Sequence, residues 1–168
     1  KYEDYEKYHV RKYGFHGTSH RYVLGEAAKL LGKDPKDVNI ITVHLGNGSS
    51  ITAIKNGQSV DTTMGLTPLE GLIMGTRSGD LDPTVVSYLG DKKGMNASEM
   101  VNYLNKQCGI LGVSGVSSDM RELNAAIEQG NKRARLALDM LIYRVKKFIG
   151  SYMAVLGRVD AIAVSYTH

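Results

Sequence analysis

The sequence predicts an α/β or α+β fold rather than a helical bundle, on three observations. Residues 38–63 contain three short β-type runs that are separated by glycine-containing turns. Residues 119–129 and 131–156 then carry apolar residues at helical spacing, and residues 159–164 form one more apolar β-type run. A chain of 168 residues is long enough to bury its own core, so we expect residues 1–168 to form a single domain.

Composition and charge exclude several classes of protein. Hydrophobic residues make up 42% and charged residues 23% of the chain, which is typical of a globular domain and excludes a disordered or collagen-like chain. Cys108 is the single cysteine and cannot form an internal disulfide, which indicates a reducing, cytoplasmic setting. No apolar run reaches the roughly 18 residues of a membrane span, and residues 1–10 lack the apolar segment of a signal peptide. The net charge of +4 is spread along the chain without a stripe of basic and aromatic residues, so we expect neither a nucleic-acid nor a membrane partner.

The first predicted helix covers residues 24–31, because apolar side chains recur there at positions 24, 27, 28, 30 and 31. Thr18 or Ser19 is suited to cap the start of this helix, and Gly32 is suited to end it. The Asp34-Pro35 pair then predicts a turn before the first strand.

Residues 38–63 predict a three-stranded antiparallel meander. Residues 38–45, 50–55 and 58–62 are the three β-type runs. Gly46-Asn47-Gly48 forms the first turn, and Asn56-Gly57 fits a two-residue hairpin turn.

The second half of the chain predicts mostly helices. Residues 65–82 are glycine-rich and irregular, and a short helix begins at Pro83. Asn96 and Glu99 have the spacing of a capping box for a helix that runs to about residue 107. Residues 109–118 are expected to be a loop of small residues.

Two further helices follow, over residues 119–129 and 131–156. One face of the first carries Met120, Leu123, Ala126 and Ile127. The apolar positions of the second are Leu136, Met140, Tyr143, Val145, Phe148, Tyr152 and Val155. A final strand is predicted over residues 159–164.

The first of three chemically distinctive loops is residues 13–20, which contain His16 and His20. Two histidines four residues apart can share a helix face and bind a metal, but no third ligand lies nearby in the sequence. A glycine turn before a capped helix is a plainer interpretation. A third interpretation fits better: His16 is a hydrogen-bond donor to an anion, beside the free amides at the start of the helix.

The second loop is residues 44–50, with the sequence HLGNGSS between two strands. Glycines let backbone amides converge on a phosphate, and asparagine and serine add further donors. The loop lacks the Gly-Lys-Ser/Thr ending of a Walker motif. A phosphate cradle and a plain hairpin turn that uses positive φ both remain open.

The third loop is residues 74–83, in which Arg77 stands among small residues. The planar, permanently charged guanidinium suits phosphoryl oxygens. Asp80 and Asp82 are candidates to hold Arg77 or Mg²⁺, whereas the alternative is an ordinary surface arginine. Histidine, arginine and a glycine cradle without an evident nucleophile favour phosphoryl transfer, which depends on positioning and charge stabilisation.

The same loops resemble the acetate kinase family. Residues 11–23 read RKYGFHGTSHRYV, which is similar to the family signature, and residues 44–50 resemble its second phosphate motif. Residues 61–72 and 75–80 also match the family pattern. Further matches at residues 117–121 and 159–162 extend the resemblance almost to the end of the sequence.

The resemblance implies the actin-like fold of sugar kinases and Hsp70, in which two ribonuclease-H-like halves enclose the active site. This chain would be most of the C-terminal, nucleotide-side half. His16 would contact the phosphoryl group in transit, and Arg77 would stabilise its charge. The residues implied to line the ATP phosphates are His44, Leu45, Gly46, Asn47 and Gly48. The residues implied to lie along the nucleotide are Asp119, Met120 and Arg121.

The implied reaction transfers the γ-phosphoryl group of ATP to acetate directly and in line, giving ADP and acetyl phosphate. The family pattern also includes parts that this sequence lacks. An N-terminal domain would supply a metal-site asparagine, an acid/base aspartate, and an arginine and a histidine for the acyl substrate. An adenosine-binding turn would follow residue 162, where this sequence continues with residues 163–168 instead.

We therefore expect a fragment that is inactive by itself, with the Mg²⁺ ligands outside this segment and a homodimeric parent protein. The alternative is a non-catalytic nucleotide- or phosphate-binding module of the same fold.

Overall fold

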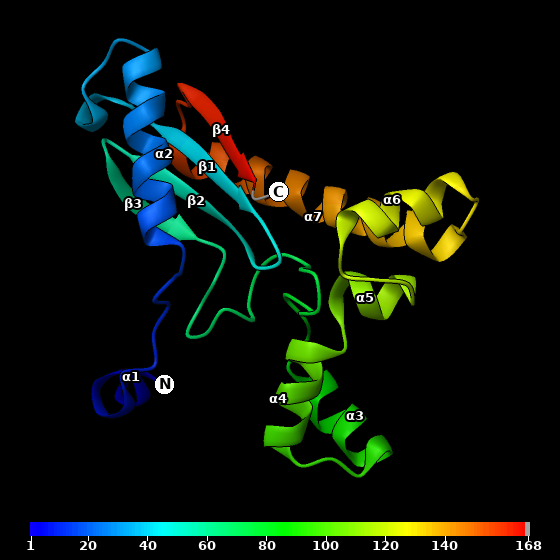
Figure 1. Ribbon diagram of the computed structural model, residues 1–168. Coiled ribbons are helices and arrows are strands. Elements are labelled where there is room, and N and C mark those ends of the chain that lie inside the picture. The colour runs from blue at the N-terminus through cyan, green and yellow to red at the C-terminus, as the bar shows by residue number, and fades with distance from the viewer. Residues whose placement is uncertain (167–168) are drawn as a thin grey trace.

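The computed structural model describes residues 1–166, and it confirms the predicted mixed α/β fold (Figure 1). Four strands form one sheet, and helices lie on both of its faces and beyond one end. The strands are β1 (Ile40–Leu45), β2 (Ser49–Lys55), β3 (Gln58–Thr62) and β4 (Ala161–Tyr166). The helices are α1 (Tyr2–Tyr8), α2 (Gly17–Leu30), the 3₁₀ turn η1 (Pro35–Asp37), α3 (Thr84–Lys93), α4 (Ala97–Lys106), α5 (Gly109–Ser114), α6 (Met120–Glu128) and α7 (Lys132–Leu156).

The sheet has the strand order β3-β2-β1-β4. The strands β1, β2 and β3 are antiparallel, which confirms the predicted meander, and β4 is parallel to β1. The turn between β2 and β3 uses positive φ at Asn56 and Gly57, as an Asn-Gly hairpin turn requires. The strand β4 begins at Ala161, two residues later than predicted, and Asp160 precedes it. The carboxylate of Asp160 accepts from the amide of Asn39, and its amide donates to the carbonyl of Asn39.

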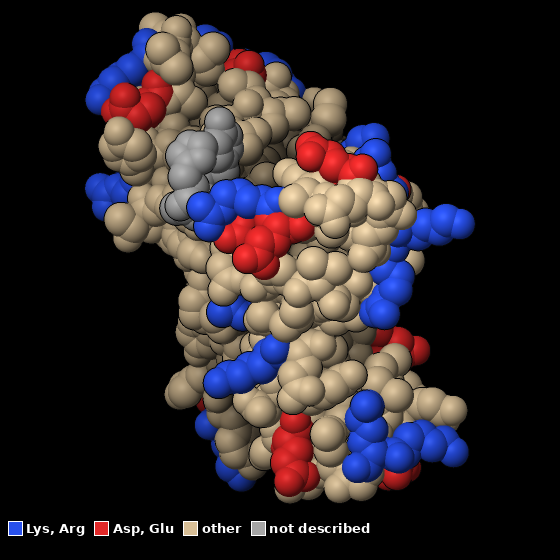
Figure 2. All heavy atoms as spheres, turned by 45° about the vertical axis from the view of Figure 1, so that its right-hand side comes forward, with Lys and Arg blue, Asp and Glu red and all other residues tan. Residues whose placement is uncertain are grey.

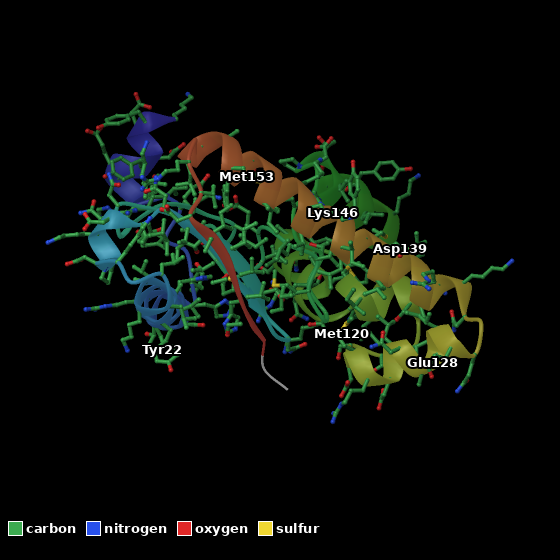
Figure 3. The ribbon with its side chains drawn as sticks, turned by 90° about the horizontal axis from the view of Figure 1, so that it is seen from above. Tyr22, Met120, Glu128, Asp139, Lys146 and Met153 are labelled. Atoms are coloured by element: carbon green, nitrogen blue, oxygen red, sulfur yellow. The ribbon has the colours of Figure 1, made fainter. Side chains whose placement is uncertain are left out.

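The two faces of the sheet are covered by different helices. Alternate side chains of β1 point to opposite faces, so Ile41 and Val43 pack against α7, whereas Ile40 packs against α2. Figure 3 shows α2, which carries Tyr22, and α7, which carries Lys146 and Met153, on opposite sides of the sheet.

The face under α2 changes from apolar to polar along the strands. Ile40 and Ile54 pair at one end of this face and are buried against α2. Thr42 and Thr52 form the next cross-strand pair, and His44 then pairs with Ser50 beside the β1–β2 turn. The first turn of α2 lies over this polar end, so polar side chains from the helix and the sheet meet there.

A second group of helices extends from the end of the sheet. The helices α3 and α4 pack together, while α5 and α6 lie along the first half of α7 (Figure 1). The predicted capping box at Asn96 and Glu99 is confirmed at the start of α4. The prediction of a loop over residues 109–118 is wrong in its first part, because residues 109–114 form α5 with Ile110 buried against α6 and α7.

Three further features of the helices differ from what the sequence predicted. The cap of α2 is His16, not Thr18 or Ser19, and within the described part of the chain no side-chain hydrogen bond caps this helix. The helix α1 was not expected, and none of its residues is buried. Only part of the apolar face expected on α7 is covered: Val145, Phe148 and Tyr152 pack on the core. The residues of that face that are exposed are Leu136, Met140, Tyr143 and Val155.

Charged residues of both signs are interspersed on the face that Figure 2 shows. Within residues 1–166, no helix combines the length and apolar character that crossing a bilayer requires. The last two residues of the unusual C-terminal tail, 167 and 168, lie outside the described residues.

Candidate active site

Three segments that are distant in the sequence meet at the amino end of α2. The rings of His16 and His44 stack with their centroids 4.1 Å apart. A Cβ placed on Gly48 would lie 3.0 Å from Nη1 of Arg77 and 3.5 Å from Nε2 of His16. The structure therefore brings together four of the residues that the sequence singled out, one or more from each of the three loops. We call these residues the cluster: His16, His44, Gly48 and Arg77.

The start of α2 is built to face an anion. His16 adopts a left-handed backbone conformation with φ of 60°, which is uncommon for a residue with a side chain. No side chain of residues 1–166 caps the helix, so its first amides keep their hydrogen-bonding capacity and the positive end of the helix dipole is not neutralised. This arrangement supports the interpretation of His16 as a donor beside free helix amides.

The β1–β2 turn does not use its glycine for positive φ. Neither Asn47 nor Gly48 has a positive φ. The side chain of Ser49 bonds both the amide and the carbonyl of Gly46, whereas the amides of Asn47 and Gly48 have no partner among residues 1–166. The absence of a side chain at Gly48 leaves room for Nη1 of Arg77, which lies 3.0 Å from the Cβ position, and this favours the phosphate cradle over the plain hairpin turn. Leu45 differs from its neighbours, because it packs against the core on the α7 side.

Arg77 is half-buried and is held at the edge of this turn. Its Nη1 lies 3.4 Å from the carbonyl oxygen of Pro68 and 3.7 Å from the sulfur of Met74. The start of α5 supports the loop, because the amide of Ile110 donates to the carbonyl of Met74. A Cβ on Gly109 would collide with the backbone of Met74 and of Arg77, so this glycine lets the two segments pack closely.

Asp80 and Asp82 do not hold Arg77, which corrects one of the options that the sequence left open. The carboxylate of Asp80 accepts from the amide of Gly71 at 2.7 Å and pairs with Arg144 at 3.6 Å. Asp82 accepts from the amide of Thr84 at the start of α3. Both carboxylates therefore serve the local structure, and Arg77 keeps its charge available.

Asp119, Met120 and Arg121 lie to one side of the cluster. Asp119 caps α6, and the guanidinium of Arg121 lowers its pKa to about 2. Both side chains are exposed to solvent, and neither has a hydrogen bond to the histidines or to Arg77 in the described part of the chain. The preceding residue Ser118 borders the cradle, since a Cβ on Gly75 would contact both Ser118 and the side chain of Asn47.

Sequence reasoning missed the hydrogen bonds that join a set of polar residues behind the cluster. Ser50 bonds Nδ1 of His16 at 2.8 Å and Nε2 of His20 at 2.7 Å. Thr42 bonds Nδ1 of His20, and Ser19 bonds Nδ1 of His44. Alternation along β1 and β2 was the available signal, because it places Thr42, His44 and Ser50 on one face.

His20 uses both ring nitrogens in these hydrogen bonds, so it is not free to ligate a metal together with His16. Across residues 1–166, no group of three or more His, Cys, Asp and Glu side chains is arranged to hold a metal ion.

The environment keeps His16 and His20 uncharged at neutral pH. Burial, together with the neighbouring His44 and Arg77, lowers the pKa of His16 below its usual value. Burial lowers the pKa of His20 to about 4, with smaller effects from His16 and His44. Neutral imidazoles at neutral pH each carry one N–H and one lone pair, so they act as both donors and acceptors.

We expect the unfolding free energy to fall as the pH drops from 7 towards 4. The pKa of His20 is about 4 in the folded chain and near 6.5 when the ring is exposed, so the unfolded state binds the proton first. This linkage removes on the order of 3 kcal/mol by pH 4. Urea denaturation across this pH range measures the effect.

His20→Gln is the matched variant for that measurement. It should be less stable than the unsubstituted chain at pH 7 and should lose less stability on acidification. Equal pH slopes for the two proteins would contradict the neutral, buried state of His20.

Comparisons with known proteins agree on one family. The chain matches the acetokinase family over residues 1–167. It is 66% identical over 161 residues to the acetate kinase of Finegoldia magna, which is 96% of this chain and 40% of that relative. The acetate kinase of Phocaeicola vulgatus is 62% identical with the same coverage.

Solved structures of the same kind superpose closely. The crystal structure of Porphyromonas gingivalis acetate kinase matches with a TM-score of 0.94 and 53% identity, over 96% of this chain and 40% of that one. A propionate kinase from Francisella tularensis matches with a TM-score of 0.92 and 49% identity, over 96% and 41%. The chain therefore spans about 40% of the length of the relatives that it matches.

Proposed function

This chain belongs to the acetokinase family and has its actin-like fold, and on that premise we propose that it provides the phosphate-binding side of an acetate kinase active site. The proposed reaction transfers the γ-phosphoryl group of ATP to acetate, in line and reversibly, giving ADP and acetyl phosphate. One observation supports this most: Nε2 of His16, Nη1 of Arg77 and the open side of Gly48 converge on one point. A cation, a neutral donor and free amides around one point suit a phosphoryl group with developing charge.

Each group has its own part in the proposed mechanism. Arg77 neutralises charge on the equatorial oxygens of the phosphoryl group in transit, and His16 donates a hydrogen bond from another side. The turn formed by residues 44–48 cradles the ATP phosphates through the amides of Asn47 and Gly48. Residues 119–121 lie along the nucleotide, next to the cradle.

The residues gathered here do not fit a magnesium site. Mg²⁺ prefers oxygen ligands in octahedral geometry, whereas this cluster offers imidazoles, a guanidinium and amide N–H groups. The two carboxylates of the Arg77 loop, Asp80 and Asp82, accept from the amides of Gly71 and Thr84. We therefore propose that any Mg²⁺ that accompanies ATP is held by groups outside these residues.

The proposal extends to the parent protein as a cytoplasmic homodimer that acts on acetate. The match to a propionate kinase leaves the preference among short carboxylates as a matter for direct assay.

The proposal is tested in a grafted enzyme, which we define as the Finegoldia magna acetate kinase with its matching 161-residue segment replaced by the corresponding residues of this chain. This graft keeps the remaining part of a full-length relative and exchanges only the segment in question. Formation of acetyl phosphate by a folded graft supports the enzyme function, and a folded but inactive graft favours the non-catalytic module.

We expect Gly48→Val in the grafted enzyme to raise the KM for ATP by at least about tenfold, equivalent to roughly 1.4 kcal/mol of lost binding. The added side chain would crowd Nη1 of Arg77, which lies 3.0 Å from the Cβ position, and would block phosphate approach. Gly150→Val is the matched control, because a Cβ there meets no atom of residues 1–166 within 4 Å. An unchanged ATP KM in a folded Gly48→Val enzyme would restore the plain-turn interpretation.

A further inference from the structure

A continuous chain of hydrogen bonds runs from the sheet to the proposed phosphate site. Oγ1 of Thr42 lies 2.8 Å from Nδ1 of His20, and Nε2 of His20 lies 2.7 Å from Oγ of Ser50. Oγ of Ser50 then lies 2.8 Å from Nδ1 of His16. Thr42, His20 and Ser50 are almost fully buried, so solvent does not compete for these bonds.

These hydrogen bonds can be donated in one of two directions along the series, and a count of hydrogens distinguishes the two. Each hydroxyl carries one hydrogen, and each neutral imidazole carries one N–H and one lone pair. If Thr42 donates to His20, then His20 donates to Ser50, and Ser50 donates to Nδ1 of His16. Each of the three donated hydrogens then has an acceptor. Because Nδ1 of His16 accepts, the single N–H of its neutral ring resides on Nε2.

The opposite direction leaves one hydrogen without an acceptor. Nδ1 of His16 would donate to Ser50, Ser50 to His20, and His20 to Thr42. The hydroxyl hydrogen of Thr42 would then be unpaired, because His20 is its only side-chain partner among residues 1–166, and Thr42 is 1% exposed. An unpaired buried donor costs free energy, so the first direction is favoured.

We propose that Thr42, His20 and Ser50 are positioning residues that hold His16 as the Nε2–H tautomer, with this hydrogen directed toward the phosphate site. The proposal rests on the proposed function, in which His16 donates to the phosphoryl group. Nε2 is the ring nitrogen on the Gly48 side, 3.5 Å from the Cβ position of that glycine. The other tautomer would present a lone pair there and repel an anion.

The direct test is long-range ¹H–¹⁵N correlation NMR of histidine rings in the 168-residue chain at pH 7.5. The proposal predicts the Nε2–H tautomer for both His16 and His20. The Nδ1–H tautomer at His16 would overturn it. This measurement needs no catalysis, so its failure is distinct from a failure of the proposed function.

Variants at Thr42 test whether the tautomer of His16 is set from a distance. Thr42→Val keeps the shape and removes the hydroxyl, so the directional bias is lost and the ring signals of both His20 and His16 should move to mixed tautomers. Thr42→Ser keeps the hydroxyl and should retain the single tautomer. Thr52→Val is the matched control, because Thr52 is the cross-strand partner of Thr42 but bonds Thr62 instead.

Kinetics in the grafted enzyme complete the test. Ser50→Ala and Thr42→Val should each lower kcat by about tenfold, as loss of an orienting partner does, with the ATP KM unchanged and with activity retained in Thr42→Ser. An unchanged kcat in both folded variants would overturn the positioning role. If Arg77→Ala also leaves kcat unchanged, the proposed function itself fails. If Arg77→Ala is inactive while the other two variants keep a normal kcat, only this inference fails.

Discussion

Arg77→Ala in the grafted enzyme is expected to lower kcat by about 10³-fold, in the range found for arginines that stabilise phosphoryl transfer. The ATP KM should change little, because the guanidinium acts on charge that develops in the transition state. The half-buried position of Arg77 and its closeness to Gly48 and His16 strengthen this effect, since water is partly excluded there. Steady-state assay of acetyl phosphate formation measures both constants.

Two comparisons make this result interpretable. Arg135→Ala removes an exposed arginine from α7 and should leave kcat unchanged. His16→Ala should cause a smaller loss than Arg77→Ala, because water can partly replace a neutral donor. A near-normal kcat in a folded Arg77→Ala enzyme would exclude the role proposed for this arginine.

The 168-residue chain by itself is expected to form no measurable acetyl phosphate. It spans about 40% of the length of its relatives, and in-line transfer requires both reactants to be held against one another. Correct positioning supplies effective molarities of up to about 10⁵–10⁸ M, so its loss removes turnover even where single contacts survive. Assay of the purified chain with ATP, Mg²⁺ and acetate measures this, beside a full-length relative.

Turnover by the chain comparable to that of the full-length relative would overturn that expectation. It would mean that residues 1–168 contain every group that the reaction needs.

Local sequence patterns predicted the sheet well, because its signals lie within a few residues of one another. The short β-type runs and the Asn56-Gly57 pair were sufficient for the meander, and the structure contains both the three antiparallel strands and the hairpin turn. The parallel pairing of β4 with β1 joins residues more than a hundred positions apart, and no local pattern encodes it.

Tertiary packing explains α5, which the sequence did not predict. The segment that forms α5 contains glycine, valine and serine, which are poor helix formers. It is helical because Ile110 is buried and because the amides of Ile110 and Leu111 pair with the Arg77 loop. The exposed apolar residues of α7 have the right spacing for burial, but no described element covers them.

The sequence predicted only those parts of the candidate site that local patterns mark. Glycine spacing marked the β1–β2 turn and the Arg77 loop, and their meeting is visible in the structure at Gly48. The partner of Asp80 is Arg144, which stands 64 positions away, so the sequence alone could not show that this carboxylate is occupied. The hydrogen bonds of Ser50 to two histidines likewise depend on how α2 crosses the sheet.

We propose that the amino end of α2, the β1–β2 turn and the loop that carries Arg77 form one phosphate site. ¹H–¹⁵N NMR titration of the 168-residue chain with inorganic phosphate and with ATP tests it most directly, since weak binding is sufficient for detection. We expect saturable shifts of the amides of Gly17, Asn47 and Gly48 and of the side-chain signals of His16 and Arg77, and Gly48→Val should weaken the binding that the remaining signals report. Shifts confined to other parts of the chain, or equally tight binding by a folded Gly48→Val chain, would contradict this site.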